Sequence, residues 1–130
     1  MRKAVSSADA PGAIGPYSQA IAAGGFLFIS GQIPLDAATG KLVGGDIQAQ
    51  THKVFENLGA ILTAAGASFD DVVKTTVYLC DLSLFPRVNA VYAEAFDSPP
   101  FPARATVQVA ALPLGALIEI DAIARAKRGR

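Results

Sequence analysis

The chain has 130 residues, a single cysteine (Cys80), and 11 basic and 11 acidic side chains, so its formal net charge is zero. This length fits one domain, residues 1–130, that needs neither a metal nor a disulfide to hold its core. The sequence contains no run of the ~20 apolar residues that a membrane span requires, and a nucleic-acid partner is not expected because the basic residues gather only in the C-terminal AKRGR, which we interpret as a solvated end.

The N-terminal half predicts strands and then a long helix. The expected segments are, in chain order, a strand (3–5), a Gly- and Pro-rich loop (8–19), a hairpin (arms 19–22 and 26–30) and a polar loop (34–45). Gly24-Gly25 supplies the hairpin turn. The apolar spacing then becomes helical, with Asp46 at the N-cap and Gly66 at the position after the C-cap.

The C-terminal half returns to strands. The expected segments are a β-branched strand (71–80), a second helix, a Pro-rich break (98–102), a strand (103–112), a tight turn (113–116) and a last strand (117–126). Asp81 or Ser83 caps the second helix, whose first turn accommodates Pro86. This order indicates an α+β domain with a six-stranded mixed sheet and both helices packed on one face.

The two faces of the predicted sheet differ in polarity. The last strand alternates between an apolar side, expected under the helices, and a side that carries Glu119 and Asp121. We assign Arg104 and Thr106 of the preceding strand to that polar side, and the tight turn pairs the two strands so that Arg104 faces Arg125. Hydrophobic residues make up 52% of the chain and charged residues 17%. That is apolar for a small monomer, so we expect the second face to pack against copies of the same chain.

The side chains that could carry chemistry need no cofactor. One His and one Cys do not make a zinc site, and GAIGPYS lacks the lysine and the following helix of a phosphate-binding loop. The remaining candidates are Tyr17, Ser30, Gly31, Asn89, Arg104, Thr106 and Glu119. Each also has a purely structural interpretation, such as a packing tyrosine or a solvated arginine. In the predicted register Arg104 and Glu119 are not cross-strand neighbours, so they would meet only across subunits.

Seven segments resemble the RidA (YjgF) family in their order and spacing: GPYSQAI, FISGQIP, the AAG that ends the first helix, VVKTTVYL, VNAVYAEAF, FPARATVQVAALP and IEIDAIA. The resemblance covers residues 10–126. It implies a chorismate-mutase-like α+β domain that forms a homotrimer. The sheets of the three subunits would make a central barrel, with the helices outside and the ligand clefts between subunits.

The resemblance also implies an enamine/imine deaminase that hydrolyses 2-imino acids, such as 2-iminopropanoate and 2-iminobutanoate, to 2-keto acids and ammonia. By this resemblance Arg104 clamps the substrate carboxylate and Glu119 positions the attacking water. The implied pocket-lining residues are Tyr17, Ser30, Gly31, Asn89 and Thr106. Thr106 stands where many members have Cys, which excludes a thiol role at that position.

These residue types suit the reaction. A guanidinium binds a carboxylate through two parallel hydrogen bonds. A protonated imine is already electrophilic, and a carboxylate side chain can orient the attacking water and transfer its proton. Two alternatives remain open: the endoribonuclease or translation-inhibitor activity of the family's older name, which the zero net charge supports little, and a non-catalytic small-ligand-binding or chaperone-like trimer. The N-terminus lacks the apolar run of a secretory signal, so we expect a cytoplasmic protein.

Overall fold

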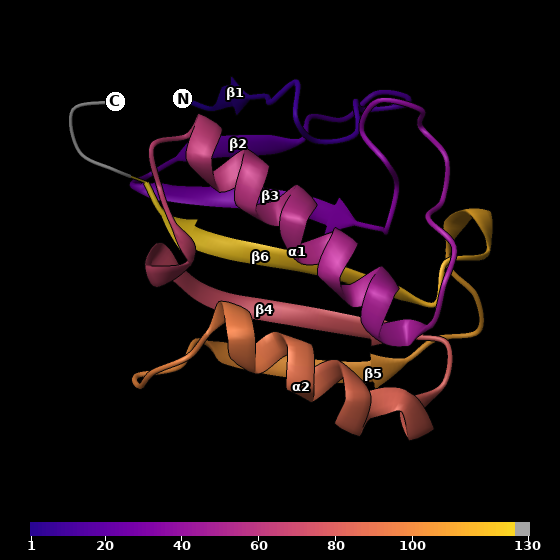
Figure 1. The fold of residues 1–130 in the computed structure, drawn as a ribbon. Helices are drawn as coiled ribbons and strands as arrows, with labels where there is room; N and C mark the ends of the chain where they lie inside the picture. Colours follow the sequence, from indigo (N-terminus) through magenta and orange to yellow (C-terminus); the bar gives the residue numbers. More distant parts are fainter. Residues whose placement is uncertain (127–130) are drawn as a thin grey trace.

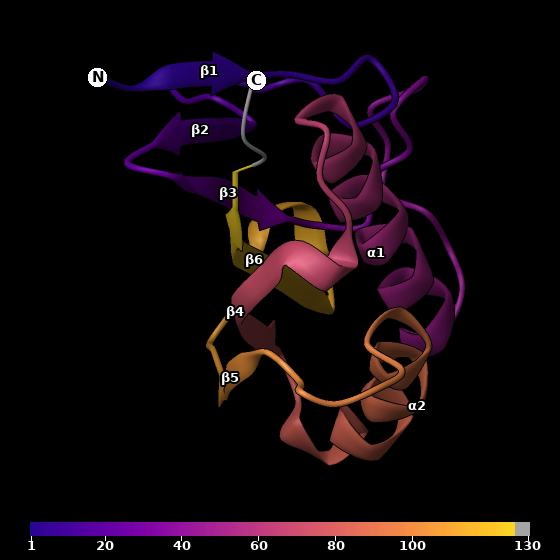
Figure 2. The same ribbon diagram turned by 90° about the vertical axis from the view of Figure 1, so that its left-hand side faces the viewer.

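The computed structural model describes residues 1–126 as a six-stranded sheet with two helices on one of its faces (Figures 1 and 2). The strands are Lys3–Val5 (β1), Ala20–Ala23 (β2), Phe26–Gln32 (β3), Val72–Leu79 (β4), Ala103–Gln108 (β5) and Ile118–Arg125 (β6). The helices are Ile47–Ala64 (α1) and Phe85–Ala95 (α2). The predicted α+β class, the mixed sheet and the position of both helices are therefore confirmed. The basic tail at 127–130 lies outside the described residues.

The strands are arranged in the order β1-β2-β3-β6-β4-β5, which runs from top to bottom in Figure 1. All neighbours are antiparallel except β4 and β5, which are parallel. The predicted pairing of the last two strands was wrong, because β4 lies between them and Arg104 pairs with Thr75 rather than with Arg125. Residues 109–117 form no tight hairpin. They include a short 3-10 turn, Pro113–Gly115, and carry the chain past β4.

The ends of the helices follow from local side-chain chemistry. Asp46 caps α1 as predicted, since its Oδ1 accepts a hydrogen bond of 3.0 Å from the backbone N–H of Ala49. Gly66 follows the helix with a φ of 73°, a conformation that glycine adopts without a steric penalty. Asp81 caps the 3-10 turn Leu82–Leu84 that precedes α2, rather than α2 itself.

The core lies between the helices and the sheet. Helix α1 packs on β3 and β6, and α2 packs against α1 (Figure 2). Four aromatic rings join the two helices and the segment before β4: Phe55, Phe69, Tyr92 and Phe96. Their neighbouring centroids lie 4.8–6.0 Å apart, within the range of favourable aromatic pairs. This cluster fixes α2 against α1.

The opposite face of the sheet is covered by no helix in the described part of the chain (Figure 2). Phe26 and Phe28 of β3 are 43% and 45% exposed there, and Val107 of β5 is 40% exposed. Large apolar side chains left exposed on an uncovered sheet face indicate a contact surface. Within residues 1–126, neither helix combines the length and the apolar character that crossing a membrane requires.

Candidate active site

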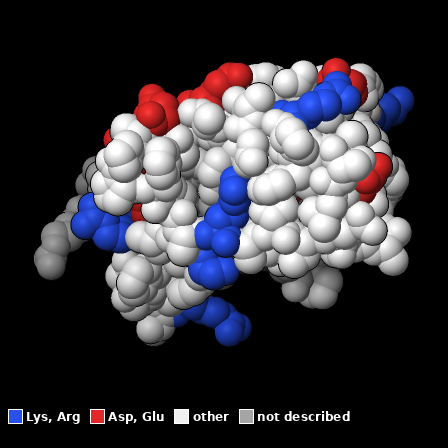
Figure 3. Space-filling view, turned by 90° about the horizontal axis from the view of Figure 1, so that it is seen from below, with Lys and Arg blue, Asp and Glu red and all other residues white. Residues whose placement is uncertain are grey.

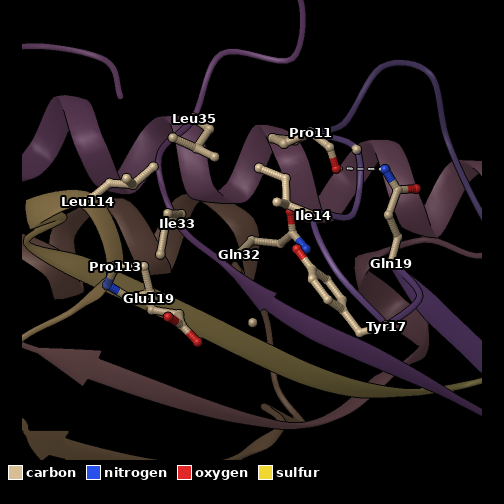
Figure 4. Close-up of a pocket in the computed structure, with 12 residues that line it drawn as sticks. Pro11, Ile14, Tyr17, Gln19, Gln32, Ile33, Leu35, Pro113, Leu114 and Glu119 are labelled. Carbon is tan, nitrogen blue, oxygen red and sulfur yellow. Dashed lines mark hydrogen bonds between the residues drawn. The ribbon is translucent and has the colours of Figure 1, made fainter. Parts of the chain in front are cut away.

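The predicted site residues fall into two groups. Tyr17, Gly31 and Glu119 line a cavity of about 430 Å³ near the start of β6 (Figure 4). Arg104 and Asn89 line a second hollow of about 480 Å³ beside α2. Ser30 adjoins the first group along β3, and Thr106 follows Arg104 on β5. In the described range no three His, Cys, Asp or Glu side chains are placed to hold a metal ion.

A bulge in β3 shapes the first cavity. Ile29 pairs with Ala122, and Gln32 pairs with Ile120, so β3 has one more residue than β6 between these pairs. The glycine at position 31 lets the Glu119 side chain lie directly against the β3 backbone. A Cβ built there would overlap Oε2 of Glu119 and lie 2.8 Å from its Cδ. Gly31 lies inside β3, one residue beyond the predicted end of that arm at Ser30, and a glycine next to a strand prediction was the available sequence signal for this close approach.

Glu119 has an unusual electrostatic environment. Burial of its carboxyl group raises its pKa, and the negative charge of Asp121, two residues along the same face of β6, raises it further. Tyr78 pairs with Glu119 across the strands and donates a hydrogen bond of 2.9 Å to Oδ2 of Asp121. That hydrogen bond is the main cause of the raised pKa of Tyr78. Glu119 therefore holds a proton at a higher pH than an ordinary carboxyl group, which suits a residue that accepts a proton and returns it.

The loop that carries Tyr17 is fixed by a buried amide that sequence reasoning missed. Gln19 is 5% exposed. Its Oε1 accepts a hydrogen bond of 2.6 Å from the N–H of Ser7, and its Nε2 donates one of 2.8 Å to the carbonyl of Pro11 (Figure 4). Because both ends of the amide are used, this Gly- and Pro-rich loop is held to β2. Ser30 strengthens the attachment, since its Oγ donates a 2.6 Å hydrogen bond to the carbonyl of Ser18.

Two further buried amides come from α1 and support other parts of the cavity wall. Asn57 Nδ2 donates a hydrogen bond of 3.0 Å to the carbonyl of Leu35, in the loop after β3. Gln50 Oε1 accepts one of 3.0 Å from the N–H of Leu117, just before β6. Both lie on the apolar stripe of α1 with Val54 and Ile61, and a polar residue on such a stripe is the sequence signal that could have revealed them.

Arg104 is held on the surface of α2. Its Nη1 donates a hydrogen bond of 2.8 Å to Oδ1 of Asn89. Its Cζ lies 4.6 Å from the ring centroid of Tyr92 and 5.0 Å from that of Phe85, so the cation is stacked on two aromatic rings. Within residues 1–126 no carboxylate lies within 4.0 Å of the guanidinium. Arg104 is thus a positioned cation whose charge no acidic side chain of the described chain neutralises.

The assignment of Arg104 and Thr106 to the same face as Glu119 was wrong. Arg104 pairs with Thr75, which is 1% exposed and hydrogen-bonded to Tyr92 beneath α2. Thr106 pairs with the fully buried Val77 on that same helix-covered side. Tyr78, the partner of Glu119, points to the other side of β4. The error followed from pairing β5 with the wrong strand, and the two groups face away from each other within one chain.

Solved structures with the same arrangement of sheet and helices include Rid proteins. A conserved Rid family protein from Yersinia pestis has a TM-score of 0.94 and 47% identity, with 97% of this chain and 100% of that chain covered. E. coli TdcF, solved with bound serine, has a TM-score of 0.90 and 43% identity, with 96% and 99% covered. The human 2-iminobutanoate/2-iminopropanoate deaminase is 51% identical over 124 residues, which cover 95% of this chain and 90% of that protein.

The family follows from the whole-chain match. The profile of the family described as Endoribonuclease L-PSP matches residues 7–126. The chain belongs to this family, which includes the RidA proteins, and the predicted RidA resemblance is confirmed.

Proposed function

We propose that this protein is a 2-iminobutanoate/2-iminopropanoate deaminase. The observation that carries the proposal is the guanidinium of Arg104, which Asn89 and two aromatic rings hold in place while other N–H donors stay available for a carboxylate. Relatives with this deaminase name share about half of the sequence in human and cattle, at 51% identity each. Serine in the TdcF structure is a small molecule with the same carboxylate.

The reaction is a hydrolysis that needs one group to bind the substrate carboxylate and one group to accept and return a proton. Arg104 binds the carboxylate of the protonated imine R–C(=NH₂⁺)–COO⁻. The carboxylate of Glu119 takes a proton from water as the water oxygen attacks the imine carbon, which gives a neutral amino group on a carbinolamine. Glu119 then returns the proton to that nitrogen, the C–N bond breaks, and the hydroxyl becomes the ketone. Glu119 takes the hydroxyl proton as the ketone forms and passes it to the departing ammonia, so the products are a 2-keto acid and ammonium.

We assign the complete site to the boundary between two copies of the chain in a homotrimer. Arg104 and Glu119 lie on opposite faces of one sheet, so a second copy is needed to bring an arginine to a glutamate. The exposed Phe26, Phe28 and Val107 provide an apolar surface for that contact on the open face. In this arrangement the open faces pack inward and both helices lie outside. A cytoplasmic location stays a prediction.

The ribonuclease alternative has little support from the charge distribution. Figure 3 shows the molecule from the side of α2 and β5, where Lys and Arg side chains are scattered among a largely uncharged surface. A nucleic-acid-binding face instead carries clustered basic residues that follow the phosphate backbone. The zero net charge of the whole chain agrees with this.

One preparation tests both activities. Ammonia release from 2-iminobutanoate, generated in situ, should exceed the spontaneous rate and should fall by about 10²–10⁴-fold in Glu119→Gln. RNA cleavage by the same preparation should be absent or equal in the two proteins. Imine hydrolysis at the spontaneous rate, or RNA cleavage that depends on Glu119, would contradict the proposal. Sedimentation should give three times the 13.4 kDa chain mass.

A further inference from the structure

We propose that Gln50 and Asn57 of α1 are positioning residues for the hydrolysis. Their side-chain amides hold the end of β3 and the start of β6 so that Glu119 lies against Gly31. The inference rests on the proposed deaminase function. Gln50 is 5% exposed and Asn57 is 2% exposed, so their contacts are made inside one chain and do not depend on how the copies assemble.

The two amides lie on the face of α1 that covers the sheet. They are seven residues apart, which is two helical turns, so their side chains point the same way. Val54, Leu58 and Ile61 share this face and are at most 2% exposed. A polar side chain among them must find its hydrogen bonds in the interior. Both amides find them on backbone groups next to the strands.

Asn57 holds the segment that leaves β3. Its Nδ2 donates hydrogen bonds of 3.3 Å to the carbonyl of Ile33 and 3.0 Å to the carbonyl of Leu35. Ile33 directly follows the last residue of β3, and both Ile33 and Leu35 line the Glu119 cavity (Figure 4). One amide nitrogen with two backbone acceptors therefore fixes the path of the chain just beyond the bulge at Gly31.

Gln50 holds the segment that enters β6. Its Oε1 accepts a hydrogen bond of 3.0 Å from the N–H of Leu117, two residues before Glu119. The carbonyl of Leu117 accepts another, of 3.2 Å, from the N–H of Cys80 at the end of β4. Both backbone groups of Leu117 are thus bonded, one to α1 and one to the neighbouring strand, and the backbone that carries Glu119 is anchored on both sides.

The strand ladder alone does not fix Glu119 against β3. A bulge interrupts the pairing of β3 with β6, and the last pair is Gln32 with Ile120, one residue before Glu119 is reached. Beyond that pair, α1 holds the two chain segments through Asn57 and Gln50. The approach is close, since a Cβ at Gly31 would lie 2.8 Å from Cδ of Glu119. A reacting group must be held within about 0.5 Å of its productive position, so these bonds bear on the rate.

The test measures kcat and KM for 2-iminobutanoate in Gln50→Met and Asn57→Leu. Each substitution keeps a side chain of similar shape and removes the hydrogen bond. We expect kcat to fall about tenfold or more in each variant, because a displacement of about 1 Å costs up to 10²-fold. KM should stay within about twofold, because Arg104 of the neighbouring copy still binds the substrate carboxylate. Gln50→Glu keeps an acceptor for the N–H of Leu117 and should keep most of the wild-type kcat.

Thr51 provides the matched control. It is fully buried on the same helix, and its Oγ1 donates a hydrogen bond of 2.6 Å to the carbonyl of Ile47 within α1. Thr51→Val therefore removes a buried hydrogen bond that does not reach the strands, and kcat should stay near wild type. All assays are run well below the melting temperature of each variant.

The Glu119→Gln background separates positioning from a general loosening of the fold. That protein has no basic carboxyl group to misplace. Adding Gln50→Met or Asn57→Leu to it should change the residual rate by less than about twofold, although each lowers kcat in the wild-type background.

The outcomes separate this inference from the function on which it rests. If the wild type hydrolyses the imine only at the spontaneous rate, the deaminase proposal fails and this inference fails with it. If the wild type is active but both variants match Thr51→Val, or if both lower the residual rate of Glu119→Gln as strongly as that of the wild type, the amides are only structural and the deaminase stands. Failure of both variants to fold, or a loss in Gln50→Glu equal to that in Gln50→Met, would also overturn the inference.

Discussion

Replacing Gly31 by alanine should disable Glu119 without unfolding the protein. A Cβ at position 31 would overlap Oε2 and lie 2.8 Å and 3.1 Å from Cδ and Cγ of Glu119. Ordinary contact between such atoms begins near 3.5 Å, so the carboxyl group must move by about 1 Å. A displacement of that size costs about 10²-fold in a well-oriented reaction. Stability should change by less than about 1 kcal/mol, because the end of one flexible side chain moves and the unfolded state loses entropy.

Gly12 provides the matched control. It lines the same cavity, and a Cβ built there meets nothing within 4 Å. The assay is kcat/KM for 2-iminobutanoate, with a thermal melt of each variant. Gly31→Ala should lose about 10²-fold while Gly12→Ala stays near wild type. Full activity in Gly31→Ala would show that the position of Glu119 against β3 is not needed for catalysis.

Substitutions at three other residues test the remaining groups. Arg104→Lys keeps the charge but loses the planar guanidinium, so kcat/KM should fall about 10²-fold, and in Arg104→Ala it should fall at least as far. Sedimentation should show the assembly intact in both variants. Activity equal to wild type would mean that Arg104 is only a solvated surface residue. For Glu119→Gln, the raised pKa means that the folded state binds the proton more tightly than the unfolded state. The stabilisation from Glu119 is then full below its unfolded pKa and is lost as pH rises through its folded pKa. The variant should therefore melt higher than wild type near pH 7 and equally near pH 3, and equal melting at both would contradict the pKa shift. Asp121→Asn removes a negative neighbour, so the acid limb of the kcat/KM profile should move to lower pH, and an unmoved limb would exclude that coupling.

The sequence predicted the elements of the fold well because their signals are local. The cap at Asp46, the paired glycines of the first hairpin and the helical spacing of α1 each act within a few residues. The alternation in β6 correctly separated buried from half-buried positions, since the strand is central and one of its faces is covered. Local pattern left each candidate site residue with a structural interpretation as well, and a resemblance over nearly the whole chain then supplied the expected roles.

The prediction failed where a long-range pairing decided the geometry. Alternation within 103–112 divided that strand correctly into two sides, but it did not say which side faced the helices. That choice depends on the neighbouring strand, and the assumption of a hairpin placed Arg104 beside β6 instead of β4. The bulge at Gly31 and the hydrogen bonds of Gln19 and Asn57 were missed for the same reason, because their partners lie at least 8 residues away along the chain.

A complementation experiment tests whether Arg104 of one chain and Glu119 of another form one site. Inactive Arg104→Ala and Glu119→Gln proteins are unfolded together, refolded as a mixture and assayed with 2-iminobutanoate. Random mixing gives about a quarter of the sites an intact arginine from one copy and an intact glutamate from its neighbour. We expect recovery of about a quarter of the wild-type activity, whereas either variant refolded alone should keep at most about a hundredth of it. A mixture as inactive as its components, despite proven co-assembly, would place both residues of each site in one chain and contradict it.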